Sequence, residues 1–359
     1  MTGLELKYLK EAVESSWISS VGPLVTRFER DFSRFCGSRY GVSTNSGTTA
    51  LHLALAALRI GPGDEVILPT FTMIACANAI SYVGAKPVLV DSDVDTWTMD
   101  PSKLRRRVTS RTKAIMAVHT YGHPVDMDPI LELAEKHDLR VVEDAAEAHG
   151  AKYKGKMAGS IGDVGCFSFY SNKIITTGEG GMNVTRIRPL AERMAWLRGH
   201  AFGRRGKHFW HEELGFGYRM SALQAAVGLA QFERIHDMID KRIKHARQYN
   251  EELAGLDGLT LPVEREWARN VYWMYSVRVK KVRQRNKLIG WLGRRGIETR
   301  TFFYPIHRQP VYARSHVGER YPVADILSAS GINLPSGNGL SEAEIGRVCD
   351  EIKRFFREN

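Results

Sequence analysis

The chain has 359 residues, of which 43% are hydrophobic and 25% charged, a composition typical of a globular protein with room for two domains. Its net charge is +11, but the densest basic runs (105–113, 204–208 and 241–247) are separated along the sequence. The charge could indicate a nucleic-acid partner, but scattered basic residues do not by themselves establish one. It is compatible with attracting a polyanionic small substrate such as a nucleotide diphosphate.

The apolar stretches are short and are interrupted by polar residues, so none reaches the roughly 20 apolar residues of a membrane span. The first 17 residues are typical of an amphipathic helix and lack the features of a signal peptide. We therefore expect a cytoplasmic protein with no membrane partner. The cysteines are widely spaced and form no CxxC pair, which predicts buried thiols and no metal site; they are Cys36, Cys76, Cys166 and Cys349.

Between residues 41 and 184, short β-branched runs alternate with longer helical patterns, which predicts an α/β domain with a largely parallel sheet. The expected strands are 65–68, 87–90, 114–118, 140–143, 164–169 and 181–184. The expected helices between them are 48–58, 74–83 and 129–137.

From Ser221 the pattern predicts one long helix over 221–256, which would connect two domains. The rest of the chain predicts a smaller α+β domain, with a strand at 273–279 and helices at 283–295 and 341–356. We place the boundary near residue 235, which gives a large domain of residues 1–235 and a small domain of residues 236–359. The N-terminal helix could pack on the small domain.

A first candidate site lies at Ser46-Gly47-Thr48-Thr49, where a glycine and hydroxyl residues begin an apolar helix. The N-terminus of a helix offers unpaired N–H groups and the positive end of a dipole to a phosphate. A capped helix without a ligand would have the same sequence. Both interpretations remain open for this segment taken by itself.

Two further segments follow in the same α/β region. Asp144 ends an apolar strand, and acids at the carboxyl end of a parallel strand face the ligand site of such sheets. Lys173 follows an aromatic run and precedes a glycine-rich turn, and Ser168 could supply a hydroxyl to a phosphate. A buried lysine and a carboxylate one strand away are suited to an aldehyde cofactor held as a Schiff base with a protonated pyridine nitrogen. Taken alone, Asp144 could equally be a surface carboxylate.

Together these segments resemble the nucleotide-sugar aminotransferases of the DegT/DnrJ/EryC1/StrS family. The segments that carry the resemblance are 46–55, 61–69, 143–151 and 167–182, and the likeness extends from Trp17 to Pro335. The resemblance implies an α/β protein of PLP fold type I, like aspartate aminotransferase. It has a large, mostly parallel-sheet domain and a smaller C-terminal α+β domain, and pyridoxal 5'-phosphate is its cofactor.

The resemblance also assigns roles to single residues. Lys173 would be the Schiff-base lysine and proton carrier, Asp144 would pair with the ring nitrogen, and Glu147 would contact the ring hydroxyl. The remaining cofactor residues would be Gly47, Thr48 and Ser168 at the phosphate, Asn172 beside the lysine, and Met73 on the face of the ring. A related subgroup that removes a sugar hydroxyl has histidine in place of this lysine, so Lys173 favours amino transfer.

Two residues differ from the family pattern. Met73 stands where an aromatic residue usually covers the cofactor, although a thioether can also pack on a ring. Gly217 stands where relatives tend to have an asparagine that reaches the phosphate of the partner subunit. We therefore expect weaker cofactor retention, which the substitution Gly217→Asn should improve.

Within the family the chain most resembles perosamine synthases, which aminate C4 of GDP-4-keto-6-deoxymannose with L-glutamate. The implied sugar-site residues are Trp17, Ser19, Arg219, Tyr304 and His307. His307 could instead be a surface histidine, and Arg219 could belong to a structural ion pair. The resemblance also implies a homodimer with shared active sites. Two other functions remain open, namely amination of a UDP- or dTDP-linked 3- or 4-keto sugar and a non-catalytic regulator that keeps the cofactor site.

Overall fold

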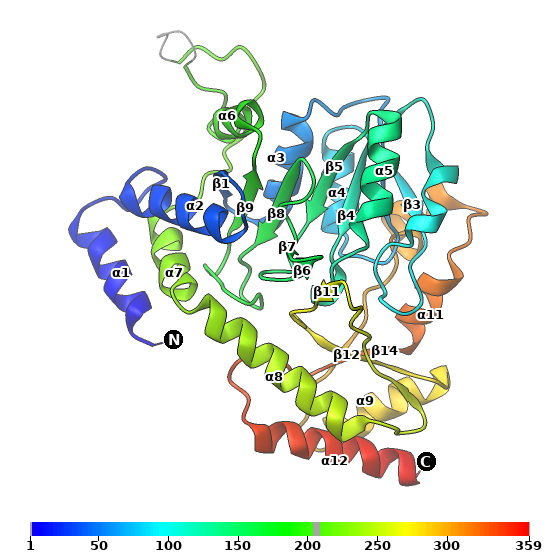
Figure 1. Cartoon of the computed structure of the whole chain (residues 1–359). Helices are drawn as coiled ribbons and strands as arrows, with labels where there is room; N and C mark the ends of the chain where they lie inside the picture. Colours follow the sequence, from blue (N-terminus) through cyan, green and yellow to red (C-terminus); the bar gives the residue numbers. More distant parts are fainter. Residues whose placement is uncertain (1, 204–208, 359) are drawn as a thin grey trace.

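The computed structural model describes residues 2–203 and 209–358, so the basic run at 204–208 lies outside the described residues. Its centre is a seven-stranded sheet (Figure 1). In spatial order the strands are β1 (Tyr40–Thr44), β9 (Gly181–Thr185), β8 (Val164–Ser168), β5 (Arg140–Asp144), β4 (Thr112–Val118), β2 (Glu65–Pro69) and β3 (Lys86–Val90). β9 is antiparallel to both of its neighbours, and the five strands from β8 to β3 are parallel.

The predicted α/β architecture and the six predicted strands are confirmed, with ends that differ by one or two residues. Helices α3 (Gly47–Ala57) and α4 (Ala75–Tyr82) cover one face of the sheet, and α5 (Met127–His137) lies on the other (Figure 1). The strands are almost continuous apolar runs because helices bury both faces of the sheet. The chain leaves each parallel strand at the same edge, and the predicted cofactor residues follow there.

The prediction of a single helix over 221–256 is wrong, because the chain forms α7 (Ala222–Phe232) and α8 (Ile235–Leu253) with a break between them. Arg234 leaves the helical region, with φ −118° and ψ 17°. Contacts from α1 (Leu4–Glu14) fix this corner, since Tyr8 donates to Glu233 and Arg234 donates to Glu5 at 2.8 Å. Thus α1 packs on α7 and lies away from the C-terminal strands (Figure 1).

The C-terminal part forms a second sheet with its own apolar core. In spatial order its strands are β10 (Leu259–Thr260), β12 (Tyr275–Val279), β14 (Gly331–Leu334) and β13 (Arg300–Thr301). The helices of this region are α9 (Arg285–Gly293), α10 (Pro310–Ala313), α11 (Pro322–Ser330) and α12 (Glu342–Glu358). A three-stranded sheet of β6 (Lys152–Tyr153), β7 (Lys156–Met157) and β11 (Ala268–Arg269) joins the two parts.

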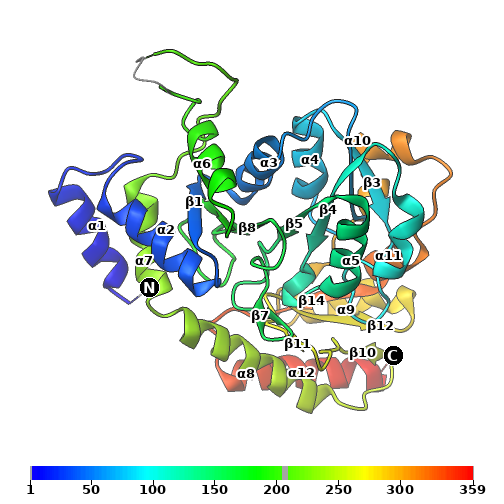
Figure 2. The same cartoon turned by 45° about the horizontal axis from the view of Figure 1, so that its top comes forward.

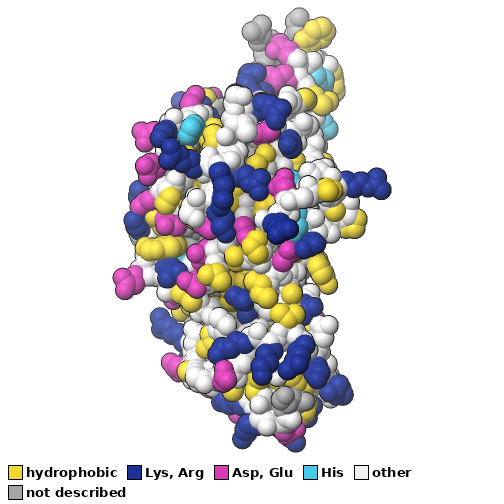
Figure 3. Space-filling view, turned by 90° about the vertical axis from the view of Figure 1, so that its right-hand side faces the viewer, with side chains coloured by type: hydrophobic (Ala, Val, Ile, Leu, Met, Phe, Trp, Pro, Cys, Tyr) yellow, Lys and Arg dark blue, Asp and Glu magenta, His cyan; other side chains and the backbone are white. Residues whose placement is uncertain are grey.

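Two helices complete the large domain, α2 (Pro23–Phe35) and α6 (Arg188–Leu197), and the segment after α6 extends away from the body (Figure 2). On the face in Figure 3, Lys and Arg side chains are spread over the surface with Asp and Glu among them. Within the described ranges, no helix has both the length and the apolar character needed to cross a bilayer.

Candidate active site

The N-terminus of α3 forms one wall of the site. Ser46 caps the helix by accepting the N–H of Thr49 at 3.2 Å, and the N–H groups of the first two helical residues, Gly47 and Thr48, have no partner within the helix. Position 47 requires glycine, because a Cβ there would lie 2.7 Å from Cβ of Ser168. The two predicted phosphate-binding segments, around Gly47 and Ser168, therefore meet in space.

Asp144, the last residue of β5, is buried and lines the same cavity as Gly47. It accepts the thiol of Cys76 at 2.9 Å and the N–H of Ala146 at 3.0 Å. Burial raises the pKa of Cys76 well above its usual value, and the Asp144 carboxylate raises it further. The thiol therefore remains a hydrogen-bond donor and holds the Asp144 side chain in place.

Glu147 and Lys173 face each other in the interior. Nζ of Lys173 lies 3.8 Å from Oε1 of Glu147, and only 10% of the lysine side chain is exposed. Burial lowers the pKa of Lys173 despite the neighbouring carboxylates, and burial raises the pKa of Glu147 to about 7. Burial therefore favours the neutral form of both groups, and each lies close enough to influence the charge of the other.

An aromatic residue of the C-terminal region, Trp273, completes this arrangement. Its Nε1–H donates to the carbonyl of Asn172 at 2.9 Å, and the Nζ of Lys173 lies 3.5 Å from its ring centroid. Trp273 is not predicted as a site residue, because an aromatic residue at the start of a predicted strand has the pattern of an ordinary core residue. Nothing else in the local sequence distinguishes it.

Tyr121 orients the carboxylate of Glu147. It lies in the left-handed region with φ 55°, a conformation that costs energy for a residue with a large side chain. In this conformation its N–H donates to Oε2 of Glu147 at 2.8 Å, and its hydroxyl accepts the N–H of Phe303 at 3.1 Å. This backbone conformation of Tyr121 thus orients the Glu147 carboxylate.

These residues enclose a cavity of about 340 Å³, which we call the cofactor cavity. The structure brings all eight predicted cofactor and catalytic residues to its lining: Gly47, Thr48, Met73, Asp144, Glu147, Ser168, Asn172 and Lys173. Helix-start amides, a hydroxyl, a carboxylate and a buried amine in the lining of one cavity fit a group that carries a phosphate, a basic ring nitrogen and an aldehyde. Met73 is 48% exposed at the rim.

The predicted sugar-site residues lie elsewhere in the single chain. Trp17 and Ser19 are at the corner between α1 and α2, Tyr304 is 61% exposed, and Arg219 lines a different cavity together with His200. Their contact with a sugar stays a prediction. The imidazole of His200 also lies against Gly217, since a Cβ at position 217 would be 3.1 Å from its Cε1.

His307 is buried in the structure, and both ring nitrogens have partners. Nδ1 pairs with Oγ1 of Thr70 at 2.8 Å, and Nε2 pairs with Oδ1 of Asp325 at 3.1 Å. In this arrangement neither nitrogen is available to a sugar, so a role in substrate binding would require His307 to leave these partners. Among the residues that the structure describes, no group of three or more His, Cys, Asp or Glu could hold a metal ion.

Comparison with known proteins agrees with this geometry. The model of the DegT/DnrJ/EryC1/StrS aminotransferase family matches residues 1–353. GDP-perosamine synthase of Caulobacter vibrioides is 47% identical over 359 residues, with 99% of this chain and 96% of the relative covered. The protein of the same name from Escherichia coli O157:H7 is 43% identical, with 100% and 97% covered.

Among solved structures, DesV of S. venezuelae in complex with a ketimine intermediate superposes with a TM-score of 0.93 at 37% identity. The match covers 98% of this chain and 94% of that one. The predicted fold type and its dependence on pyridoxal phosphate are thereby confirmed. This chain belongs to the DegT/DnrJ/EryC1/StrS family and is a pyridoxal-phosphate-dependent sugar aminotransferase.

Proposed function

We propose that the protein transfers the amino group of L-glutamate to C4 of GDP-4-keto-6-deoxymannose and forms GDP-perosamine. The sequence identity of 47% and 43% with two GDP-perosamine synthases over the full chain supports this substrate. The observation that carries the chemistry is the buried amine of Lys173, which lies between Glu147 and the indole of Trp273 in the cofactor cavity.

Pyridoxal phosphate, when bound, supplies an aldehyde that takes up amino groups and a ring that accepts electrons. Lys173 would hold it covalently and, once released, would move a proton as a neutral amine, which its lowered pKa permits. Asp144 would keep the ring nitrogen protonated. Gly47, Thr48 and Ser168 would bind the phosphate, and Glu147 would receive the ring hydroxyl.

The cavity also limits the access of water to the reacting atoms. Apolar side chains of Leu51, Val118 and Phe303 line it together with Tyr121, and a low local dielectric strengthens the interactions of the charged groups inside. Trp273 and Arg300 reach this cavity from the C-terminal region. The two parts of the chain therefore build one site.

A homodimer is part of the proposal. Large apolar side chains are exposed in the segment after α6, where Phe209 and Leu214 are 84% and 85% exposed, and at the corner of Trp17 and Ile18. Apolar surface of this kind is typical of an interface. Sedimentation velocity at low protein concentration should give the mass of a dimer, and a fully active monomer would contradict this part of the proposal.

The substrate is tested with a panel of GDP-, UDP- and dTDP-linked keto sugars, each incubated with L-glutamate and followed by mass spectrometry of the product. We expect GDP-4-keto-6-deoxymannose to be aminated fastest, and no product with the variant Lys173→Ala. Faster amination of a UDP- or dTDP-linked sugar would overturn the choice of substrate. If the wild-type protein binds the cofactor but removes no amino group from glutamate or other donors, it is a regulator.

A further inference from the structure

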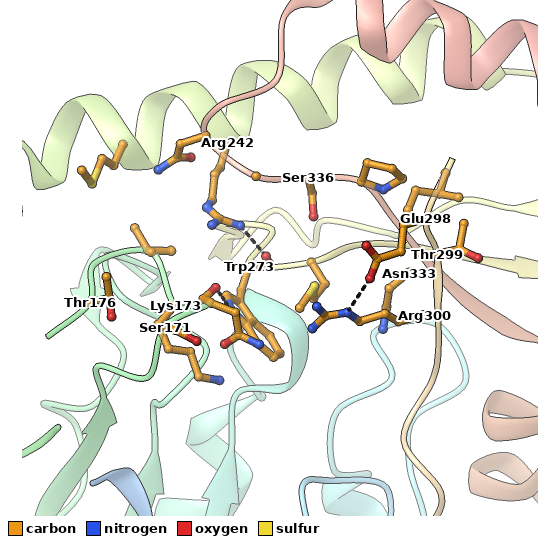
Figure 4. A pocket seen from close by; sticks show the side chains of 18 of the residues that line it. Ser171, Lys173, Thr176, Arg242, Trp273, Glu298, Thr299, Arg300, Asn333 and Ser336 are labelled. Atoms are coloured by element: carbon orange, nitrogen blue, oxygen red, sulfur yellow. Dashed lines mark hydrogen bonds and ion pairs between the residues drawn. The ribbon is translucent and has the colours of Figure 1, made fainter. Parts of the chain in front are cut away.

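A second cavity, of about 560 Å³, adjoins the cofactor cavity, and Trp273 lies in its lining (Figure 4). We call it the donor cavity. Lys173, Asn172, Trp273, Arg300 and Asn333 line both cavities. A ligand in the donor cavity would therefore contact the residues that hold and surround the reactive amine.

The donor cavity contains a buried cation for which the described residues supply no counter-ion. Arg242, on α8, is 7% exposed, and its side chain points down from the helix toward Trp273 (Figure 4). One nitrogen, Nη1, donates to the carbonyl of Trp273 at 2.5 Å, whereas Nε has no hydrogen-bond partner. No carboxylate of the described residues forms an ion pair with it. Burial lowers the pKa of Arg242 to about 10, so it still carries its charge at neutral pH.

A buried charge without a partner is costly, and folded proteins normally pair such groups. The missing partner of Arg242 is therefore an anion that enters the cavity. Two buried acceptors of the same cavity, Oδ1 of Asn172 and Oδ1 of Asn338, also lack hydrogen-bond partners. An amino acid satisfies both requirements, because its carboxylate suits the guanidinium and its ammonium group suits the amide oxygens. A phosphate would supply only the first.

We infer that the donor cavity binds the amino donor, an α-amino dicarboxylate, and that Arg242 receives one of its carboxylates. Arg300, whose Nε is 3.9 Å from a carboxylate oxygen of Glu298, is a second cation at the same cavity for the other carboxylate. This inference rests on the proposed function for the identity of the donor as glutamate. It goes beyond that function by naming the residues that bind the carboxylates of the donor.

The test uses the loaded enzyme and two separate measurements. Binding of glutarate, a dicarboxylate that cannot react, is followed by calorimetry, and the two half-reactions are followed by absorbance in single turnovers. For Arg242→Gln we expect glutarate and L-glutamate to bind at least about tenfold more weakly, as for the loss of a charge-assisted hydrogen bond. The half-reaction with the keto sugar should stay unchanged, and Arg242→Lys should restore part of the glutarate binding.

The matched control is Lys244→Gln, which removes a charge from the exposed face of the same helix, where Lys244 pairs with Glu342. It should leave both measurements unchanged. A second pair of variants covers the case in which Arg242→Gln does not fold. Gly337 lines the donor cavity and Gly339 does not, and a Cβ at either position meets nothing within 4 Å. Gly337→Glu should weaken glutarate binding, and Gly339→Glu should not.

Equal loss in both half-reactions for Arg242→Gln would mean that Arg242 only supports Trp273, and would overturn the inference. Unchanged glutarate binding would overturn it as well, as would binding of GDP, but not of glutarate, that depends on Arg242. If wild-type enzyme takes no amino group from glutamate, the donor in the proposed function is wrong. Glutarate binding that depends on Arg242 would then still support a carboxylate site.

Discussion

Glu143 and Asp144 are consecutive residues at the end of β5, but they face opposite sides of the sheet. Glu143 points to the side of α5, where it accepts hydrogen bonds from His119 at 2.9 Å and from the N–H groups of Gly159, Ile161 and Gly162 at 2.6–2.7 Å. Asp144 points into the cofactor cavity, and among the described residues its carboxylate accepts hydrogen bonds from Cys76 and Ala146 alone.

This difference separates an acid that holds the fold together from an acid that is available to a ligand. Glu143 is fully buried, and although burial alone would raise its pKa, the bonds from His119 and the loop amides lower it. Its acceptor sites are occupied by the protein. Asp144 keeps acceptor capacity on the side of the cavity, where a cationic ring nitrogen would lie. Chemical type and burial are alike in the two residues, so the number of internal donors distinguishes their roles.

The largest expected effect is the loss of stability when Glu143 is neutralised. Glu143→Gln places an amide NH₂ against backbone donors and removes the charge that they stabilise, which should cost about 3–5 kcal/mol of unfolding free energy. Urea unfolding measures this loss. Turnover per folded molecule should stay within a few-fold of the wild type. A loss of activity without a loss of stability would contradict the structural role of Glu143.

Neutralising Asp144 should instead reduce turnover more than stability. Asp144→Asn removes the charge opposite the ring nitrogen, and we expect turnover to fall by about 10²–10³-fold, the usual size of such an electrostatic contribution. The unfolding free energy should change less than in Glu143→Gln. Steady-state kinetics and urea unfolding on the same preparation give both numbers. Near-normal turnover of Asp144→Asn would exclude the proposed role of Asp144.

The α5 side of the sheet should also respond to pH. His123 is buried, its Nδ1–H donates to the carbonyl of Pro124 at 2.7 Å, and Nε2 accepts the N–H of Arg265 at 3.3 Å. Burial lowers the pKa of His123 to about 4. Between its ordinary pKa of about 6.5 and pH 4, the unfolded chain therefore binds a proton that the folded chain does not, and stability decreases as the pH falls.

For His123 this loss should amount to about 2 kcal/mol between pH 8 and pH 5. Urea unfolding at several pH values measures the slope. His123→Gln keeps a donor and an acceptor without a titrating group, so its stability should depend less on pH over the same range. A slope identical to that of the wild type would assign the pH dependence to other groups, such as His149, whose pKa burial lowers to about 3.

The smallest effect is expected at the phosphate end of the cofactor cavity. In Gly47→Ala the new methyl group would lie 2.7 Å from Cβ of Ser168, which should push the helix start away from the serine and weaken cofactor binding about tenfold. Fluorescence titration of the apoprotein with pyridoxal phosphate measures this change. The double variant Gly47→Ala with Ser168→Gly should bind more tightly than Gly47→Ala alone if the cause is steric.

The sheet and the cofactor residues could be predicted because their signals are local. The strands are buried β-branched runs, and Asp144, Ser168 and Lys173 follow such strands directly, so the rule for parallel sheets places them at one edge. The rule for parallel sheets does not predict the positions of Trp273 and Arg242. Trp273 donates to Asn172, 101 residues away in sequence, and Arg242 lines a cavity together with the lysine segment; both arrangements exist only because the later part of the chain folds back onto the sheet.

The helix break shows the same limit. The residues from Phe232 to Asp237 have no proline or glycine, so their pattern predicts a continuous helix. The chain bends at Arg234 because Tyr8 and Glu5, more than 220 residues away in sequence, bind the corner. Likewise, His307 has the local sequence of a loop histidine, and only the contacts with Thr70 and Asp325 make it part of the interior.

The indole of Trp273 belongs to the segment that enters β12, whereas the amine it covers belongs to the large sheet. Any hinge rotation of the C-terminal body would carry the indole with it and change both the solvation and the basicity of that amine. Displacement of the indole would expose the amine to water and raise its pKa, so the basicity of the proton carrier depends on the position of the C-terminal part.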